Sequence, residues 1–167
     1  MPDAALVMLD EELKETKVIL NKLLKDSYAR VIFLVDKDGQ LITSCGEDQD
    51  IDSTSLASLT AGNIAATEGL AKLLGQKEFS VLFHQGEKDN IHLSVIQRRM
   101  ILVVIFDDKS TLGLIKLRVK KACKELSAII KKLVDRATKD ITIDNGLLQE
   151  DTLLTEITDE DIERLFR

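Results

Sequence analysis

The chain has few of the residues from which catalytic and metal sites are built. Its 167 residues include only two histidines and two cysteines, and no tryptophan. Neither His84 nor His92 lies in a cluster of cysteines or carboxylates at metal-ligand spacing, so we interpret both as structural or surface residues. Cys45 and Cys123 fall in separate predicted elements, and we expect reduced packing residues rather than a disulfide.

Sequence motifs of common enzymes are also missing. No G-x-S-x-G nucleophile elbow occurs. The stretch GLAKLLGQK from Gly69 to Lys77 contains glycines and a lysine, but their spacing is not that of a phosphate-binding loop and no strand directly precedes it. We therefore expect no active site, metal or cofactor of the chain's own, and a function that depends on surfaces.

Long apolar runs are absent as well. The run MILVVIF ends at Asp107, far short of the roughly 20 apolar residues that cross a bilayer. The N-terminal stretch MPDAALVMLDEELK has neither the basic start nor the apolar segment of a signal peptide. These features predict a cytoplasmic protein without a membrane partner.

Charge is unevenly distributed along the chain, whose formal net charge is −6. Residues 111–136 contain eight basic and two acidic residues, whereas residues 138–167 contain nine acidic and three basic ones. This pattern is typical of two segments that dock on each other, of two contact surfaces, or of ordinary solvated helix surface. The acidic total, and the lack of aromatic residues among the basic ones, argue against nucleic-acid binding.

Hydrophobic periodicity predicts an α/β (α+β) fold with a five-stranded, mostly antiparallel sheet between helices. The expected order is helix, two strands, helix, three strands, helix. The first and last helices should cover one face of the sheet, and the middle helix the other. The expected ranges are helices at 5–26, 53–75 and 111–136, a hairpin within 30–46, and strands at 78–84, 91–97 and 100–106.

The hairpin is the clearest local signal. Asp38-Gly39 separates two β-branched runs, as in a tight hairpin turn. In the first run, Val31, Phe33 and Val35 alternate with Ile32 and Leu34. Both sets are apolar, so this strand should be covered on both faces.

The chain changes character after Arg136. We expect a domain at 5–136, a polar linker at 137–156 and a short amphipathic helix at 157–167. Thr158 and Asp161 form a variant of a capping box at the start of that helix. Its apolar face needs a binding surface, because so short a helix is marginal alone in water. A frayed tail is the alternative.

The segment 53–75 is the most unusual helix. Asp52 or Ser53 can cap its start, and Gly75 suits its end. Its larger apolar residues recur near the helical period, and they are Leu56, Leu59, Ile64, Leu70, Leu73 and Leu74.

Another face of this helix carries only small side chains. Ser58, Gly62, Ala65 and Gly69 follow one stripe, and Ala61 and Ala66 lie nearby. Glycine inside a helix is less favourable than alanine by about 0.5–1 kcal/mol. Two such glycines indicate that something approaches closely. It is either the chain's own sheet or another protein.

Three stretches now suggest a family. VIFLVDKDGQLI, IDSTSLASLTAGNIAATEGLAKLLG and VVIFDDKSTLGLIKLRVKKA resemble the Roadblock (dynein light chain) family, and within it the MglB-like bacterial polarity proteins, over roughly Leu6 to Asp135. The resemblance implies a homodimer with one continuous sheet and paired middle helices. It implies activation of a Ras-like small GTPase of the MglA type, in cell polarity and motility at a cell pole.

The resemblance also assigns contact residues. On the middle helix they are Ser58, Ala61, Gly62, Ala65, Gly69 and Lys72. The C-terminal helix would reach a second site on the GTPase and modulate binding or nucleotide exchange, through Ile157, Ile162, Leu165 and Phe166. The family supplies no arginine finger and rearranges the GTPase's own catalytic groups. GTP and magnesium belong to the partner.

Two other functions stay open. The chain is alternatively a scaffold subunit that binds a peptide or another Roadblock chain without affecting hydrolysis. A small-molecule or nucleotide sensor is the third possibility, and it requires a polar pocket between helix and sheet.

Overall fold

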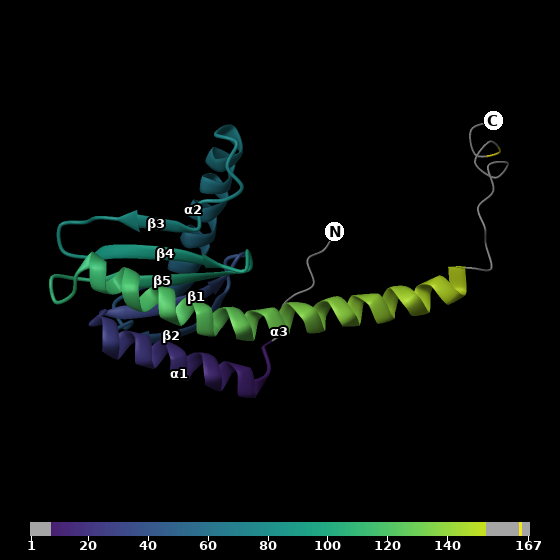
Figure 1. Ribbon diagram of the computed structural model, residues 1–167, viewed down its shortest axis with the longest axis horizontal. Coiled ribbons are helices and arrows are strands. Elements are labelled where there is room, and N and C mark those ends of the chain that lie inside the picture. The colour runs from purple at the N-terminus through teal and green to yellow at the C-terminus, as the bar shows by residue number, and fades with distance from the viewer. Residues whose placement is uncertain (1–7, 153–163, 165–167) are drawn as a thin grey trace. The chain divides into compact units, whose positions relative to one another are not determined.

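The fold follows the predicted order of elements (Figure 1). The computed structural model describes residues 8–152 and Arg164, with side chains described for 8–143 and 164. The elements are α1 (Asp10–Ser27), β1 (Val31–Asp36), β2 (Leu41–Gly46), α2 (Ser53–Leu73), β3 (Val81–His84), β4 (Asn90–Ile96), β5 (Met100–Phe106) and α3 (Leu112–Thr152).

The five strands form one sheet in the order β2-β1-β5-β4-β3, and every neighbouring pair is antiparallel. The apolar run of β5 is buried at every position, which explains its central place. Strands β2 and β3 lie at the two edges. The predicted sheet is thus confirmed.

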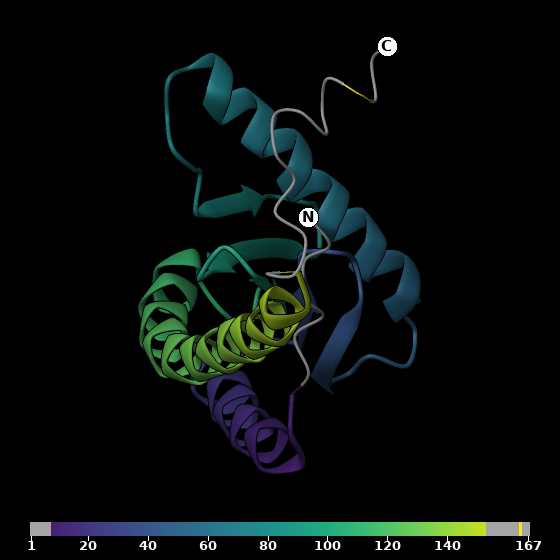
Figure 2. The ribbon, with the colours of Figure 1, turned by 90° about the vertical axis from the view of Figure 1, so that its right-hand side faces the viewer.

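Strand β1 contributes to both faces of the sheet, as its two apolar sets predict. Phe33 packs in a core that includes Ala57 and Ile64 of α2. Ile32 and Leu34 point to the opposite face and are fully buried. Figure 2 shows α2 on one side of the sheet, with α1 and the first part of α3 on the other.

The β1–β2 turn has the conformation expected of Asp-Gly. Gly39 has a φ of +93°, which disfavours residues with a side chain. The Asp36 carboxylate accepts hydrogen bonds from the backbone N–H groups of Asp38 and Gln40 at 2.9 and 3.1 Å. A Cβ atom at Gly39 would lie 3.4 Å from Ser58 Cα, so this turn packs closely on α2.

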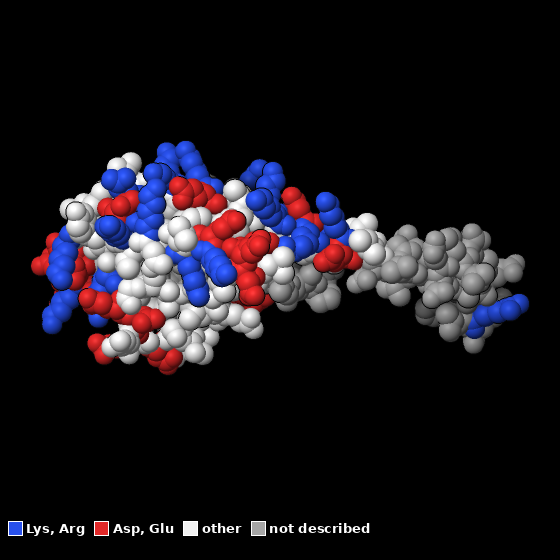
Figure 3. All heavy atoms as spheres, turned by 90° about the horizontal axis from the view of Figure 1, so that it is seen from below, with Lys and Arg blue, Asp and Glu red and all other residues white. Residues whose placement is uncertain are grey.

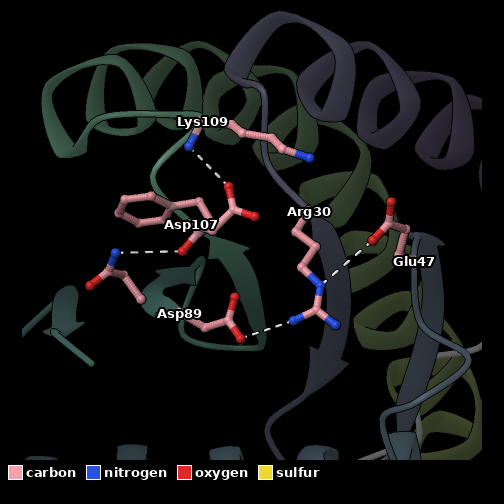
Figure 4. Close-up of polar contacts among 7 residues, drawn as sticks. Arg30, Glu47, Asp89, Asp107 and Lys109 are labelled. Carbon is pink, nitrogen blue, oxygen red and sulfur yellow. Dashed lines mark hydrogen bonds and ion pairs between the residues drawn. The ribbon is translucent and has the colours of Figure 1, made fainter. Parts of the chain in front are cut away.

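Polar contacts hold the β3–β4 connection to the rest of the sheet (Figure 4). Arg30 Nη1 donates to the Asp89 carboxylate at 2.9 Å, and Arg30 Nε lies 3.7 Å from Glu47. The hydrogen bond and charge of Asp89 raise the pKa of Arg30. The Asn90 side chain donates to the Phe106 carbonyl at 3.5 Å. These contacts fix the loop at one end of edge strand β3.

Helix α3 is longer than predicted. It continues through Thr152, so residues 137–152 are helical where the sequence predicted a linker. The segment has no proline, and one internal glycine costs a helix only about 1 kcal/mol. Residues 8–131 form one compact unit, and Lys132 onward belongs to another. The domain boundaries stay a prediction, and the expected helix at 157–167 lies outside the described residues except for Arg164.

Candidate protein-binding site on helix α2

Helix α2 contacts the sheet mainly through small side chains. Its buried residues are Ala57, Thr60, Ile64, Thr67 and Ala71. Thr67 Oγ1 donates to the Asn63 carbonyl at 2.8 Å, so its hydroxyl is satisfied within the helix. Among the large apolar residues of α2 only Ile64 is fully buried, and Leu56 is partly buried beside it. Small buried residues bring the helix close to the sheet.

The start of α2 is defined by Asp52, as predicted. Its carboxylate accepts from Ser55 N at 3.3 Å and from Ser55 Oγ at 2.6 Å. These hydrogen bonds lower the pKa of Asp52. The capped helix then runs without interruption to Leu73, and Gly75 follows with a φ of +68°.

Three leucines of α2 are exposed, and we call Leu59, Leu70 and Leu73 the leucine flank. Their exposed fractions are 74%, 57% and 83%. Helical spacing places Asn63 on the same side, and its Nδ2 lies 2.9 Å from Nε2 of His84 on β3. The leucine flank is therefore on the side of α2 that is nearest to edge strand β3.

A groove of about 460 Å³ lies between this side of α2 and the sheet. Its lining residues include Leu59, Asn63, His84, Ile91 and Leu93. Strand β3 pairs only with β4 in the described part of the chain. Exposed leucines beside an unpaired strand edge are typical of an interface with another chain.

The small flank, defined as Ser58, Gly62, Ala65 and Gly69, lies on the other exposed side of α2. All its residues are exposed. A Cβ atom at Gly62 or Gly69 would have no atom of the described residues within 4 Å. Packing on the chain's own fold therefore does not explain these two glycines.

The chain's own contacts do explain one end of the small flank. Besides approaching Ser58, a Cβ at Gly39 would lie 3.5 Å from Ala61 Cβ. The β1–β2 turn therefore lies close against α2 at these two positions. The alternative of close packing within the chain thus holds for Ser58 and Ala61 alone.

A charged area lies at the other end of the small flank. Lys72 is exposed and lines a hollow that also contains Lys37 and Glu68, whose ion pair is 3.1 Å long. Five predicted α2 residues, from Ser58 to Gly69, thus lie on one exposed side of the helix or at its border. Lys72 extends that surface.

Other predicted site residues fall outside the described part. Ile157, Ile162, Leu165 and Phe166 all do so, and their role stays a prediction. The leucine flank and the open edge of β3 were missed as site features. The available signal was the helical spacing of Leu59, Leu70 and Leu73, which share a side distinct from that of Ile64.

The histidines and cysteines are dispersed. His84 is exposed and His92 buried. Cys45 and Cys123 are unpaired, as predicted, and burial raises the pKa of each thiol to about 11. Within residues 8–152 and 164, no group of histidine, cysteine and acidic residues could hold a metal ion. No described helix is both long and apolar enough to span a membrane.

The Roadblock/LC7 domain model matches residues 15–106, which is more than half of the chain. The chain belongs to the Roadblock/LC7 family. Its element order and antiparallel sheet are those of the Roadblock fold. No curated protein sequence matches the chain at a significant level.

Solved structures of MglB proteins resemble this Roadblock chain. MglB of Myxococcus xanthus is 53% identical, with a TM-score of 0.73 over 77% of this chain and 96% of that one. The gliding protein MglB of Thermus thermophilus is 31% identical, with a TM-score of 0.73 over 78% and 98%. An MglB with a tetrameric arrangement is 30% identical, with a TM-score of 0.74 over 78% and 98%.

Proposed function

We propose that this Roadblock protein is a homodimeric activator of a Ras-like small GTPase of the MglA type. The observation that carries the proposal is that Gly62 and Gly69 are exposed and that a Cβ atom at either would meet no atom of the described residues within 4 Å. Glycines that weaken a helix and serve no internal packing suit a surface on which another backbone lies flat. The similarity to MglB proteins supports the type of partner.

The leucine flank and β3 form the homodimer contact in this proposal. Two β3 strands that pair across a twofold axis extend the sheet into the partner. The same operation brings two α2 helices side by side and covers Leu59 and Leu70. Fully burying a leucine contributes about 1.5–3 kcal/mol, so four such residues form a substantial interface.

The small flank receives the GTPase. A switch region can approach the α2 backbone closely where the side chains are glycine, alanine or serine. The dimer binds the hydrolysis-competent conformation of the GTPase more tightly, and so increases its population up to the ratio of the two affinities. The GTPase's own residues then position the attacking water and stabilise the charge of the transition state.

The test is the GTP hydrolysis rate of an MglA-type GTPase with and without this protein. Ala65→Arg and Gly69→Arg should abolish stimulation, because a long charged side chain separates the two surfaces. Leu117→Arg is the control, since Leu117 is exposed on α3 and should tolerate the change with full stimulation. Circular dichroism and light scattering verify that each variant is folded and dimeric. An unchanged rate with the doubly substituted protein would refute the proposal.

The scaffold alternative is distinguished in the same assay. If the protein binds the GTPase through α2 and leaves hydrolysis unchanged, it acts as a scaffold. For the C-terminal segment, we propose that removal of residues 153–167 preserves dimerisation and alters GTPase affinity or nucleotide exchange. Identical binding and exchange curves for the full and shortened chains would contradict this role.

A further inference from the structure

A second groove lies on the opposite face of the sheet, away from α2. It has a volume of about 540 Å³ and lies between the first part of α3 and strands β3 and β4. The proposed GTPase contact on α2 does not use it, whereas Val81 of β3, a strand of the proposed dimer contact, is among its lining residues. Its lining residues are Ser80, Val81, His92, Ser94, Val95, Lys116, Val119, Lys120, Cys123, Lys124 and Ser127.

A buried histidine without a full set of partners lies in this groove. His92 is only 2% exposed, and its Nδ1 lies 3.4 Å from Ser94 Oγ. Its Nε2 has no hydrogen-bond partner among the described residues. Most buried polar atoms in folded proteins are paired, so an unpaired one that lines a groove indicates a missing ligand.

The rest of the groove is positively charged. Lys116, Lys120 and Lys124 are spaced by four residues and therefore share one side of α3. They form no ion pair with any described residue. None of the described residues that line the groove is acidic. Like charges at this spacing disfavour a helix, and a bound anion would relieve their repulsion.

The groove also contains uncharged side chains. Burial, and then the charge of Lys116, lower the pKa of His92, which is thus uncharged at neutral pH and can donate from Nε2. The thiol of Cys123 is also neutral, since burial raises its pKa to about 11. Val81, Val95 and Val119 supply apolar surface.

We propose that this groove binds a small organic anion. The lysines and His92 Nε2 hold its phosphate or carboxylate group, and the valines contact its apolar part. The volume is within the range of about 300–1,000 Å³ found for small-molecule sites. Because the groove and α2 are on opposite faces of the sheet, the anion binds without displacing a partner on α2.

Figure 3 shows one side of the molecule with basic and acidic side chains intermixed. On the side of the molecule viewed there, basic side chains gather along one edge and acidic ones lie among them. A surface of mixed sign attracts anions only weakly. The three lysines of the groove differ because no carboxylate is among its lining residues.

The two histidines allow a direct test in the full-length protein. Their imidazole resonances are followed by NMR as inorganic phosphate or citrate is added, with sodium chloride keeping the ionic strength constant. We expect a saturable shift at His92, and a higher His92 pKa with anion bound because a negative charge stabilises the imidazolium. His84 lies outside the groove, is exposed and should not respond. The tighter of the two probes identifies the preferred anionic group.

Matched lysine variants complete the experiment. Lys116→Met should weaken binding about tenfold, since it removes a charge-assisted contact. Lys121→Met makes the same charge change at an exposed α3 position outside the groove and should leave binding unchanged. Absence of a shift, equal shifts at both histidines, equal shifts with chloride alone, or equal weakening by both variants would each overturn the proposal.

Discussion

Helices α2 and α3 pack on opposite faces of one sheet, yet their exposed sides differ in chemistry. The exposed side of α2 carries glycines, alanine and three leucines, with Lys72 near its end. The exposed side of α3 within 112–131 carries mainly lysines, together with Leu117 and Glu125. The buried sides differ too: α2 contributes one large side chain, Ile64, whereas α3 contributes several, including Ile115 and Leu126.

The difference shows which helix needs a partner. Lysine-rich helix surface is stable in water and requires no cover, whereas grouped exposed leucines leave apolar area to be buried. Helix α2 also buries only one large side chain fully, Ile64, with Leu56 partly buried beside it. It therefore has the properties of an interface element, while α3 has those of a structural element that frames a groove.

Charging the leucine flank is expected to have the largest effect. Leu70→Glu should dissociate the proposed homodimer, because the substitution removes one buried leucine from each of the two symmetry-related copies. The expected loss is about 3–6 kcal/mol, a reduction in self-association of more than a hundredfold. Sedimentation equilibrium measures it.

Leu117→Glu on α3 is the matched control, since Leu117 is 63% exposed and belongs to neither proposed interface. It should leave self-association unchanged. Equal dissociation constants for the Leu70 variant and the wild type would show that the leucine flank is not the dimer contact.

Shortening one large buried side chain on each helix tests how much that side chain stabilises the packing of α2 and of α3 on the sheet. Ile64→Ala and Ile115→Ala should each lower the free energy of unfolding by about 2–5 kcal/mol, measured with denaturant at fixed protein concentration. Only Ile64→Ala should also accelerate hydrogen exchange locally, throughout α2, because Ile64 is the one large side chain that this helix buries fully, with Leu56 only partly buried beside it. If α3 amides accelerate equally in the Ile115 variant, the two helices are held alike.

The sequence predicts much of the fold because its local and long-range signals agree. The doubly apolar pattern of β1 indicates a strand covered on both faces, and Asp38-Gly39 fixes the hairpin between β1 and β2. The continuous apolar run of β5 indicates the centre of the sheet. The two strand signals depend on residues that the chain itself buries.

The inward side of α2 was not predictable in the same way. Leucines normally mark the buried side of a helix, and here Leu59, Leu70 and Leu73 are exposed while Ala57 and Ala71 are buried. Hydrophobic periodicity does not distinguish burial within a chain from burial by a partner. The groove of His92 was missed because its residues come from β3, β4 and α3, and only the three lysines, which are spaced by four residues, form a pattern along the sequence.

Replacing the exposed glycines of α2 should have a smaller effect, with opposite signs on the free energy of unfolding and on stimulation of the GTPase. Gly62→Ala and Gly69→Ala should each raise the free energy of unfolding by about 0.4–1 kcal/mol, because the new methyl group meets open space in a helical backbone. Both should reduce stimulation of the GTPase by keeping its backbone farther from α2.

Gly113→Ala in the first turn of α3 is the control, and it also meets open space. It should stabilise the fold with no loss of stimulation. Full stimulation by all three variants would mean that the glycines of α2 do not serve close approach.

The smallest expected difference between the two helices is in how the stability contributed by their N-terminal caps depends on pH. Asp52 caps α2 through its carboxylate, and Thr111 caps α3 through a hydroxyl that accepts from Leu114 N at 3.2 Å. The pKa of Asp52 is lowered below 3.8 in the fold, first by the side-chain hydrogen bond from Ser55. Its contribution is therefore present above the unfolded pKa and is lost as the pH falls through the folded one.

Asp52→Ala should consequently destabilise the protein near neutral pH and lose that effect as the pH falls below 3.8. Thr111→Ala should destabilise to the same extent at every pH, because a hydroxyl does not titrate. Denaturant unfolding of both variants across this range measures the difference. Parallel pH curves for the two variants would show that the charge of Asp52 contributes nothing, and that the two helices begin by equivalent hydrogen bonds.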